Sequence, residues 1–275
     1  MKRSIESLFT ILFAVSLLLV SCSDSTTGTG EQQPPQLPPA SSMQADFSTF
    51  DSANPKPVSA DQTSAMTNFY TAVSATTLAK AIIELNVAIP KAIFSKAENI
   101  KPELNSEGQW EWTYSASTNG QSFKARLAGS VSANDTVDWK MYITIDTLDY
   151  KADNFMFFEG TTTLDGKEGT WIYYDLNKPD QQVKVSKMDW TIDSETSKTL
   201  TLEVLSNRND NRGDTITYTL DGSVKTVTFL DTSKDETTEI QWNDETKAGY
   251  VISPNYNGGV KSCRDQNFQD TACTE

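Results

Sequence analysis

Three cysteines carry the most distinctive chemistry in this sequence. Cys22 directly follows a short apolar segment near the N-terminus, whereas Cys263 and Cys273 lie close together in a polar segment near the C-terminus. Thiols can be acylated, joined in a disulfide or used as soft metal ligands. No further soft ligand lies near Cys263 and Cys273, which argues against a metal site. We therefore predict a disulfide between them, which requires an oxidising compartment.

Carboxylates are the other abundant reactive groups. The 275 residues include 37 acidic and 23 basic side chains and no histidine, so the net charge is -14. The lack of histidine excludes Ser-His-Asp and Cys-His catalysis and histidine-ligated metals. The acidic balance argues against a nucleic-acid partner, which would require clustered Lys and Arg.

Most of these acids fall at predicted turns or outward strand positions, where solvated carboxylates contribute little to catalysis. Examples are Glu111, Asp138, Asp146, Asp165 and Asp221. The sequence also lacks phosphate-binding, dinucleotide-binding and nucleophile-elbow motifs. We predict a protein that is not an enzyme and has no cofactor, with a glycosidase-like acid pair as the enzymatic alternative.

One predicted loop is rich in oxygen ligands. It contains Asn207, Asn209, Asp210, Asn211 and Asp214. Their spacing does not match a calcium-binding EF-hand, and the closing glutamate is missing. We predict a polar hairpin loop there and no metal site.

Residues 1–21 have the pattern of an export signal. Lys2 and Arg3 precede the apolar segment Leu8–Val20, which is too short to span a bilayer. Its end, Leu19-Val20-Ser21-Cys22, resembles the lipobox of bacterial lipoproteins. The resemblance implies cleavage before Cys22, acylation of Cys22 and attachment to a membrane through the lipid. The serine that follows the cysteine, Ser23, resembles the residue found there in outer-membrane lipoproteins. The expected location is therefore the outer membrane, on its periplasmic face or at the cell surface.

Residues 22–60 are expected to be the lipidated cysteine followed by a disordered tether. Six of the ten prolines lie in this segment, and the rest is mainly Ser, Thr, Gln and Gly. Such a composition buries too little apolar surface to become ordered by itself. The alternative is that Phe47 and Phe50 dock on the folded domain.

A single domain is predicted over residues 61–255, followed by a tail with the disulfide loop at 256–275. Asp61 is a candidate N-cap, and apolar residues recur at steps of three or four from Met66 to Ile89. This spacing predicts one helix that ends or kinks at Pro90, with a short extension to Ala97. The helix has few charges, so we expect a sheet to cover it.

After Gly108 the apolar period changes to two, which predicts strands. A two-residue turn at Asn119-Gly120 would pair Tyr114 with Ala125 and Trp112 with Leu127. A three-residue turn at 133–135 would pair Val131 with Val137, and Gly129 with Trp139. These registers place all large apolar side chains on one face.

Later hairpins extend the sheet to about eleven antiparallel strands. Turns are expected at Asp165-Gly166 and Asp221-Gly222, the second pairing Ile216 with Val227, and a bulge is expected near Ser186. Alternating threonines around 215–228 predict a solvated face. The strands are predicted at residues 110–116, 123–131, 137–145, 155–164, 167–176, 183–192, 200–206, 214–220, 223–230, 239–243 and 248–252.

The hairpin around Asp165-Gly166 has two apolar faces. One face would carry Phe158, Trp171 and Tyr173, and the other Phe155, Phe157, Ile172 and Tyr174. Such a hairpin is either a packed centre or one wall of a ligand cavity. The candidate ligand-binding residues are Phe155, Phe157, Phe158, Trp171, Tyr173 and Tyr174.

This order of elements, one helix followed by about eleven strands, is similar to that of the outer-membrane lipoprotein carrier and receptor family. The resemblance implies a strongly bent sheet or unclosed barrel, mainly β, whose helix-covered hollow accepts acyl chains. It identifies no binding residue. The expected function is a monomeric, non-enzymatic lipoprotein that binds a lipid or another apolar ligand. The alternative is a surface module that binds polysaccharide or protein through exposed aromatic rings.

Overall fold

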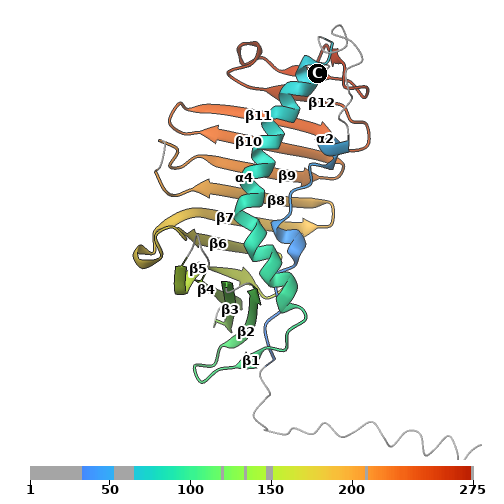
Figure 1. The fold of residues 1–275 in the computed structure, drawn as a ribbon. Helices are drawn as coiled ribbons and strands as arrows, with labels where there is room; N and C mark the ends of the chain where they lie inside the picture. Colours follow the sequence, from blue (N-terminus) through green and yellow to red (C-terminus); the bar gives the residue numbers. More distant parts are fainter. Residues whose placement is uncertain are drawn as a thin grey trace, which may run out of the picture. The chain divides into compact units, whose positions relative to one another are not determined.

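A computed structural model describes residues 33–52, 65–118, 121–132, 135–146, 151–207 and 210–273. These residues build one antiparallel sheet of fourteen strands, in which each strand pairs with the next along the chain (Figure 1). The two ends of this order, β1 and β14, do not pair with each other, so the sheet is open. The prediction of a mainly β, antiparallel and unclosed fold is therefore confirmed.

The strands include the eleven that were predicted, as β2 to β12, and three more. The additional strands β1, β13 and β14 have two or three residues each, too few for a periodic pattern. The bounds are β1 Glu103–Leu104, β2 Trp110–Thr118, β3 Gln121–Val131, β4 Thr136–Asp146, β5 Lys151–Thr163, β6 Glu168–Tyr174, β7 Lys184–Ser194, β8 Ser197–Val204, β9 Thr215–Asp221, β10 Val224–Asp231, β11 Glu236–Asn243, β12 Gly249–Ile252, β13 Ser262–Arg264 and β14 Asp270–Thr271.

The long helix α4 spans Thr67–Ala97 and continues through Pro90. The extension to Ala97 is confirmed, whereas Asp61 lies outside the described residues. Figure 1 shows α4 crossing the strands on one face of the sheet, which we call the covered face. Its side chains that pack against this face include Phe69, Ala72, Ile83, Val87 and Phe94, all buried.

A second helix, α2 (Ser48–Ser52), was not predicted, so the expectation of a single helix is wrong. Three short 3-10 turns complete the described helical elements: η1 (Ala40–Met43), η2 (Pro179–Gln181) and η3 (Asn257–Gly259).

Residues 33–52, which we call the strap, pack against the covered face, so the alternative that Phe47 and Phe50 dock on the folded domain is confirmed and the expected disorder is wrong for this segment. Phe47 and Phe50 are buried in the core of the covered face. The Phe50 ring lies edge-on to Trp242 with centroids 4.9 Å apart, and Phe47 lies 5.8 Å from Tyr218. Aromatic burial of this kind supplies the free energy that composition alone did not suggest.

The predicted registers of the first hairpins are confirmed. Tyr114 pairs with Ala125, and Gly129 pairs with both Trp110 and Trp139. The turn residues 119, 120, 133 and 134 lie outside the described residues. A register shift near Val185, between β6 and β7, agrees with the bulge expected near Ser186.

The register predicted for the hairpin of β9 and β10 is wrong by two residues. Tyr218, rather than Ile216, pairs with Val227, and the turn is Gly222-Ser223. A shift of two residues keeps every side chain on its original face. The apolar pattern therefore could not distinguish the two registers.

Four glycines of the described strands pair directly with tryptophans on neighbouring strands. A Cβ added at Gly129 would lie 2.7 Å from the Trp139 ring, and one added at Gly169 would lie 2.3 Å from Trp190. Gly129, Gly160 and Gly169 thus leave space for a ring that covers their strand, whereas a Cβ added at Gly249 would meet the Gln241 backbone oxygen at 2.1 Å rather than a ring. The pairs are Gly129 with Trp110 and Trp139, Gly160 with Trp139 and Trp171, Gly169 with Trp190, and Gly249 with Trp242.

The C-terminal residues extend the sheet, which corrects the boundary predicted at residue 255. Cys263 and Cys273 form the predicted disulfide. Between them, the Asp270 carboxylate accepts hydrogen bonds from the backbone N–H groups of Thr67 (3.1 Å) and Asn68 (2.9 Å). Asp270 therefore caps α4, whose own N-cap residue, Met66, forms no side-chain cap.

We expect Asp270→Ala to lower the free energy of unfolding by about 1–2 kcal/mol, as for loss of a helix cap. Thr271→Ala, at the exposed neighbouring position in β14, should leave stability unchanged. Urea unfolding of both variants with the disulfide intact measures the difference. Equal stabilities would show that Asp270 does not cap the helix.

Candidate functional site

The six aromatic residues predicted as a ligand site are not divided between the two faces as expected: Phe155 lies on the covered face with Phe158, Trp171 and Tyr173, whereas Tyr174 lies on the opposite face beside Glu159. β5 has an extra residue at Phe157 relative to β4, because Met141 pairs with Phe158 and Tyr142 pairs with Met156. This bulge brings Phe155 and Phe158 to the same, covered face. Phe157 is half-buried, and the other five predicted residues are buried.

Rings fill the space between the helix and the centre of the sheet. Phe94 of α4 lies 5.6 Å from Trp171 and 6.0 Å from Phe158, measured between ring centroids. Phe158 also lies 5.9 Å from Tyr173. Burial raises the pKa of the Tyr173 phenol far above its ordinary value. These contacts correspond to the packed-centre alternative for this hairpin.

The opposite face of the sheet, which we call the open face, carries polar side chains. Along β8, β9 and β10 buried residues alternate with half-exposed ones, which are largely threonines. Direct cross-strand pairing aligns one polar row over nine strands. The row contains Ser130, Asp138, Thr161, Thr170, Asp189, Thr201, Thr217, Thr228 and Glu239.

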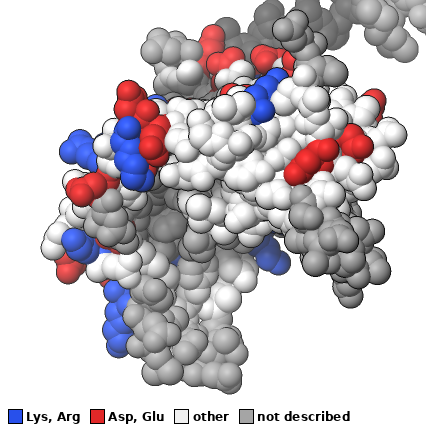
Figure 2. Space-filling model, turned by 90° about the horizontal axis from the view of Figure 1, so that it is seen from above, with Lys and Arg blue, Asp and Glu red and all other residues white. Residues whose placement is uncertain are grey.

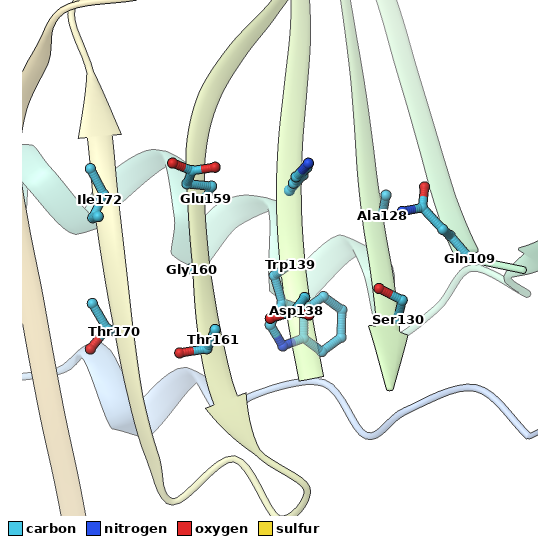
Figure 3. Close-up of a pocket in the computed structure, with 11 residues that line it drawn as sticks. Gln109, Ala128, Ser130, Asp138, Trp139, Glu159, Gly160, Thr161, Thr170 and Ile172 are labelled. Atoms are coloured by element: carbon cyan, nitrogen blue, oxygen red, sulfur yellow. The ribbon is translucent and has the colours of Figure 1, made fainter. Parts of the chain in front are cut away.

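A pocket of about 490 Å³ lies on the open face over β3 to β6 (Figure 3). We call it the main pocket. Two rows of cross-strand neighbours line it, part of the polar row above and a mixed row of Ala128, Lys140, Glu159 and Ile172, in which the small Ala128 side chain is only 3% exposed. The lining side chains from the open face are Gln109, Ala128, Ser130, Asp138, Lys140, Glu159, Thr161, Thr170 and Ile172.

Glu159 is the most firmly held charge in the main pocket. The Tyr174 hydroxyl donates a hydrogen bond of 2.5 Å to Glu159 Oε1. Burial, together with this bond to a carboxylate, raises the pKa of Tyr174 far above its ordinary value. Tyr174 was predicted as a ligand residue, but it acts here by fixing the orientation of Glu159.

The remaining polar groups of the pocket differ in their freedom. Thr170 donates its hydroxyl proton to Asp189 Oδ1 at 2.6 Å, so its oxygen is left to accept. Within the described part of the chain, Asp138 and Lys140 have no hydrogen-bond or ion-pair partner. The pocket thus presents acceptors and one flexible ammonium donor.

Sequence reasoning did not identify this pocket. It placed Asp138 correctly as an outward acid, but outward positions of a strand are not by themselves a site. The pocket arises because Asp138, Glu159 and Thr170 lie on three neighbouring strands. Correct registers for β4, β5 and β6 would have shown their proximity.

In the described part of the predicted polar loop at 207–214, the side chain of Asp214 holds a neighbouring turn. Asp214 Oδ1 accepts hydrogen bonds from the backbone N–H of Thr232 (2.9 Å) and from its hydroxyl (3.0 Å). Asn209 lies outside the described residues. Among those that are described, no three acidic or cysteine side chains gather as metal ligands.

Comparison with family models, curated proteins and solved structures finds no match for this chain. In the described part of the chain, no helix has the length and apolar character needed to cross a membrane. Cys22 and the export signal lie outside that part, so lipidation of Cys22 remains a prediction.

Proposed function

We propose that the chain is an exported, non-enzymatic outer-membrane lipoprotein that binds polysaccharide on the open face of its sheet. Cys22 would carry the lipid anchor. The observation that supports the binding surface is the main pocket, a concave polar site on a face that neither α4 nor the strap covers. Its volume of about 490 Å³ lies within the range of small-ligand sites.

The chemistry of the pocket suits a sugar ring. A carboxylate such as Glu159 or Asp138 can accept hydrogen bonds from two adjacent hydroxyls, and Lys140 can donate to a ring or hydroxyl oxygen. Ala128 and Ile172 supply an apolar surface for the C–H groups of the ring. Few ligands other than carbohydrates combine many hydroxyls with such C–H faces.

This proposal differs from both hypotheses drawn from the sequence in how the ligand is held. Trp112, Trp139, Trp171, Trp190 and Trp242 are all buried, so they are not exposed aromatic platforms. The contacts of Phe94 with Phe158 and Trp171 leave the expected apolar hollow without structural support. Recognition through hydroxyls and carboxylates of the open face is the mode we propose.

Thr161→Trp should block the pocket and weaken polysaccharide binding by at least about tenfold, because the new ring fills its mouth. Thr199→Trp is the matched control, since Thr199 is also an exposed threonine of the open face, on β8 outside the pocket. Affinity electrophoresis of the detergent-solubilised full-length protein through gels containing single polysaccharides measures binding. Unretarded migration of the wild-type protein in every gel would refute the proposed function.

A further inference from the structure

A second cavity adjoins the main pocket on the open face. It has a volume of about 320 Å³ and lies over β4 to β7. The two cavities share Thr161 and Thr170, which pair directly across β5 and β6. One cavity lies on each side of this threonine pair along the strand direction. A ligand that fills both must therefore be longer than one compact unit.

The charges around both cavities are mainly negative. Their combined lining contains four carboxylates, Asp138, Glu159, Glu168 and Asp189, and one basic side chain, Lys140. Lys187 forms an ion pair with Asp189 at 2.8 Å, from outside the lining. Figure 2 shows the molecule from above, where basic and acidic side chains are interspersed. The whole chain has a net charge of -14.

Such a lining opposes anionic ligands. A uronate or sulfate group in the main pocket would lie near the carboxylates of Asp138 and Glu159, and Lys140 alone would offset the repulsion. Hydroxyl groups meet no such cost, because carboxylates accept their protons as hydrogen bonds. The negative charge of the lining thus lowers the affinity for anionic polysaccharides relative to uncharged ones.

We infer that the two cavities are consecutive subsites for a polysaccharide without anionic groups, and that Glu159, positioned by Tyr174, determines this specificity. The inference rests on the proposed function and adds its substrate class. One oxygen of Glu159 accepts from Tyr174, so the second oxygen is left for the sugar. Thr170 donates to Asp189 and accepts from a sugar hydroxyl at the boundary between the subsites.

Matched pairs of polysaccharides test the charge selectivity. Dextran against dextran sulfate, and neutral xylan against glucuronoxylan, differ in anionic groups on the same backbone. We expect each anionic member to bind at least about tenfold more weakly than its neutral partner at low salt, with a smaller difference at high salt. Equal or tighter binding of the anionic members would overturn the inference.

Chain length tests the two subsites. For oligomers of the neutral polysaccharide that binds best, affinity should rise at least about tenfold between one and two or three units and then level off. Full affinity for the monosaccharide would contradict a two-subsite ligand.

Glu159→Gln tests the specificity residue and has a close internal control. Tyr250 donates a hydrogen bond of 2.5 Å to Glu239. This tyrosine–glutamate pair on β12 and β11 is equivalent to Tyr174–Glu159 but lies outside both cavities. Glu159→Gln should weaken neutral-polysaccharide binding about five- to tenfold and reduce the discrimination against anionic chains. Glu239→Gln should change neither.

The outcomes separate the two proposals. If the wild-type protein binds no polysaccharide, the proposed function fails. If it binds neutral and anionic members alike, or if Glu159→Gln behaves as Glu239→Gln does, binding by the open face stands and the subsite inference fails.

Discussion

Trp171→Ala is expected to lower the free energy of unfolding by about 3–5 kcal/mol, the largest effect we predict for one side chain. Trp171 is fully buried. Its ring centroid lies 4.8 Å from Phe158, 5.1 Å from Trp190 and 5.6 Å from Phe94. Alanine would leave a cavity between α4 and the sheet that these rigid neighbours cannot fill.

Trp171→Phe separates ring packing from the indole nitrogen. Among the described residues Trp171 Nε1 has no hydrogen-bond partner, so phenylalanine removes a buried unsatisfied donor while it retains an aromatic ring. We expect this change to cost less than about 1.5 kcal/mol. Trp110→Ala, at a half-buried position of the same face, should cost less than Trp171→Ala. Denaturant unfolding of the three variants measures these costs, and equal losses for both alanine variants would contradict a packed centre.

The face of the sheet on which each side chain lies is the feature of this fold that the sequence specifies best. Trp112 and Trp139 fall on one face because the residues between them alternate and the connecting turns have a definite length. Their rings lie 5.7 Å apart, as expected for neighbours in one core. Local rules suffice here because each strand pairs with the next in sequence, so register depends only on adjacent residues.

Features that depend on irregular backbone or on distant partners could not be predicted. A single bulge at Phe157 places Phe155 on the covered face, so Phe155 does not belong to the second apolar face that was predicted for the hairpin. The strap is proline-rich, which by composition favours disorder. Its docking depends on Tyr218 and Trp242, which lie far away in the sequence.

The candidate site could likewise be predicted only where it depends on alternation within one strand. Alternation identified Asp138 as outward-facing, and this is confirmed by its exposure. The main pocket also needs Glu159 and its bond to Tyr174 on the next strand. That bond depends on how β5 and β6 pair on either side of the bulge, which no pattern of apolar residues specifies.

Basic side chains at the margin of the covered face hold the strap. Lys198 Nζ donates to the backbone carbonyl of Gln44 at 2.5 Å. Lys225, whose side chain is 4% exposed, donates to Asp46 Oδ2 at 2.5 Å and also to Asp244. Two acids from different parts of the chain therefore meet at one buried ammonium group, and the strap is fixed to β10 through it.

Lys225→Met should lower the free energy of unfolding by about 2–3 kcal/mol and release the strap. Removal of one member of a buried ion pair leaves the other charge without compensation, at a cost of about 3–5 kcal/mol. We expect less, because the Asp46 side chain is 46% exposed. Lys234→Met, which removes the exposed ion pair with Asp231, should change stability little. Proteolysis within residues 33–52 while the sheet persists would report release of the strap.

The pH dependence of the strap contact provides an independent measurement. Burial alone raises the pKa of Asp46, but hydrogen bonds from Lys225 and Ser48 outweigh it and lower the pKa from 3.8 to about 2. Because the pKa is lower in the folded protein, the contribution of Asp46 is complete above about pH 4 and is lost as the pH falls to about 2. Unfolding of the wild-type protein across this interval should show a steeper loss of stability than unfolding of Lys225→Met. Parallel pH profiles for the two proteins would mean that Lys225 does not hold the strap through Asp46.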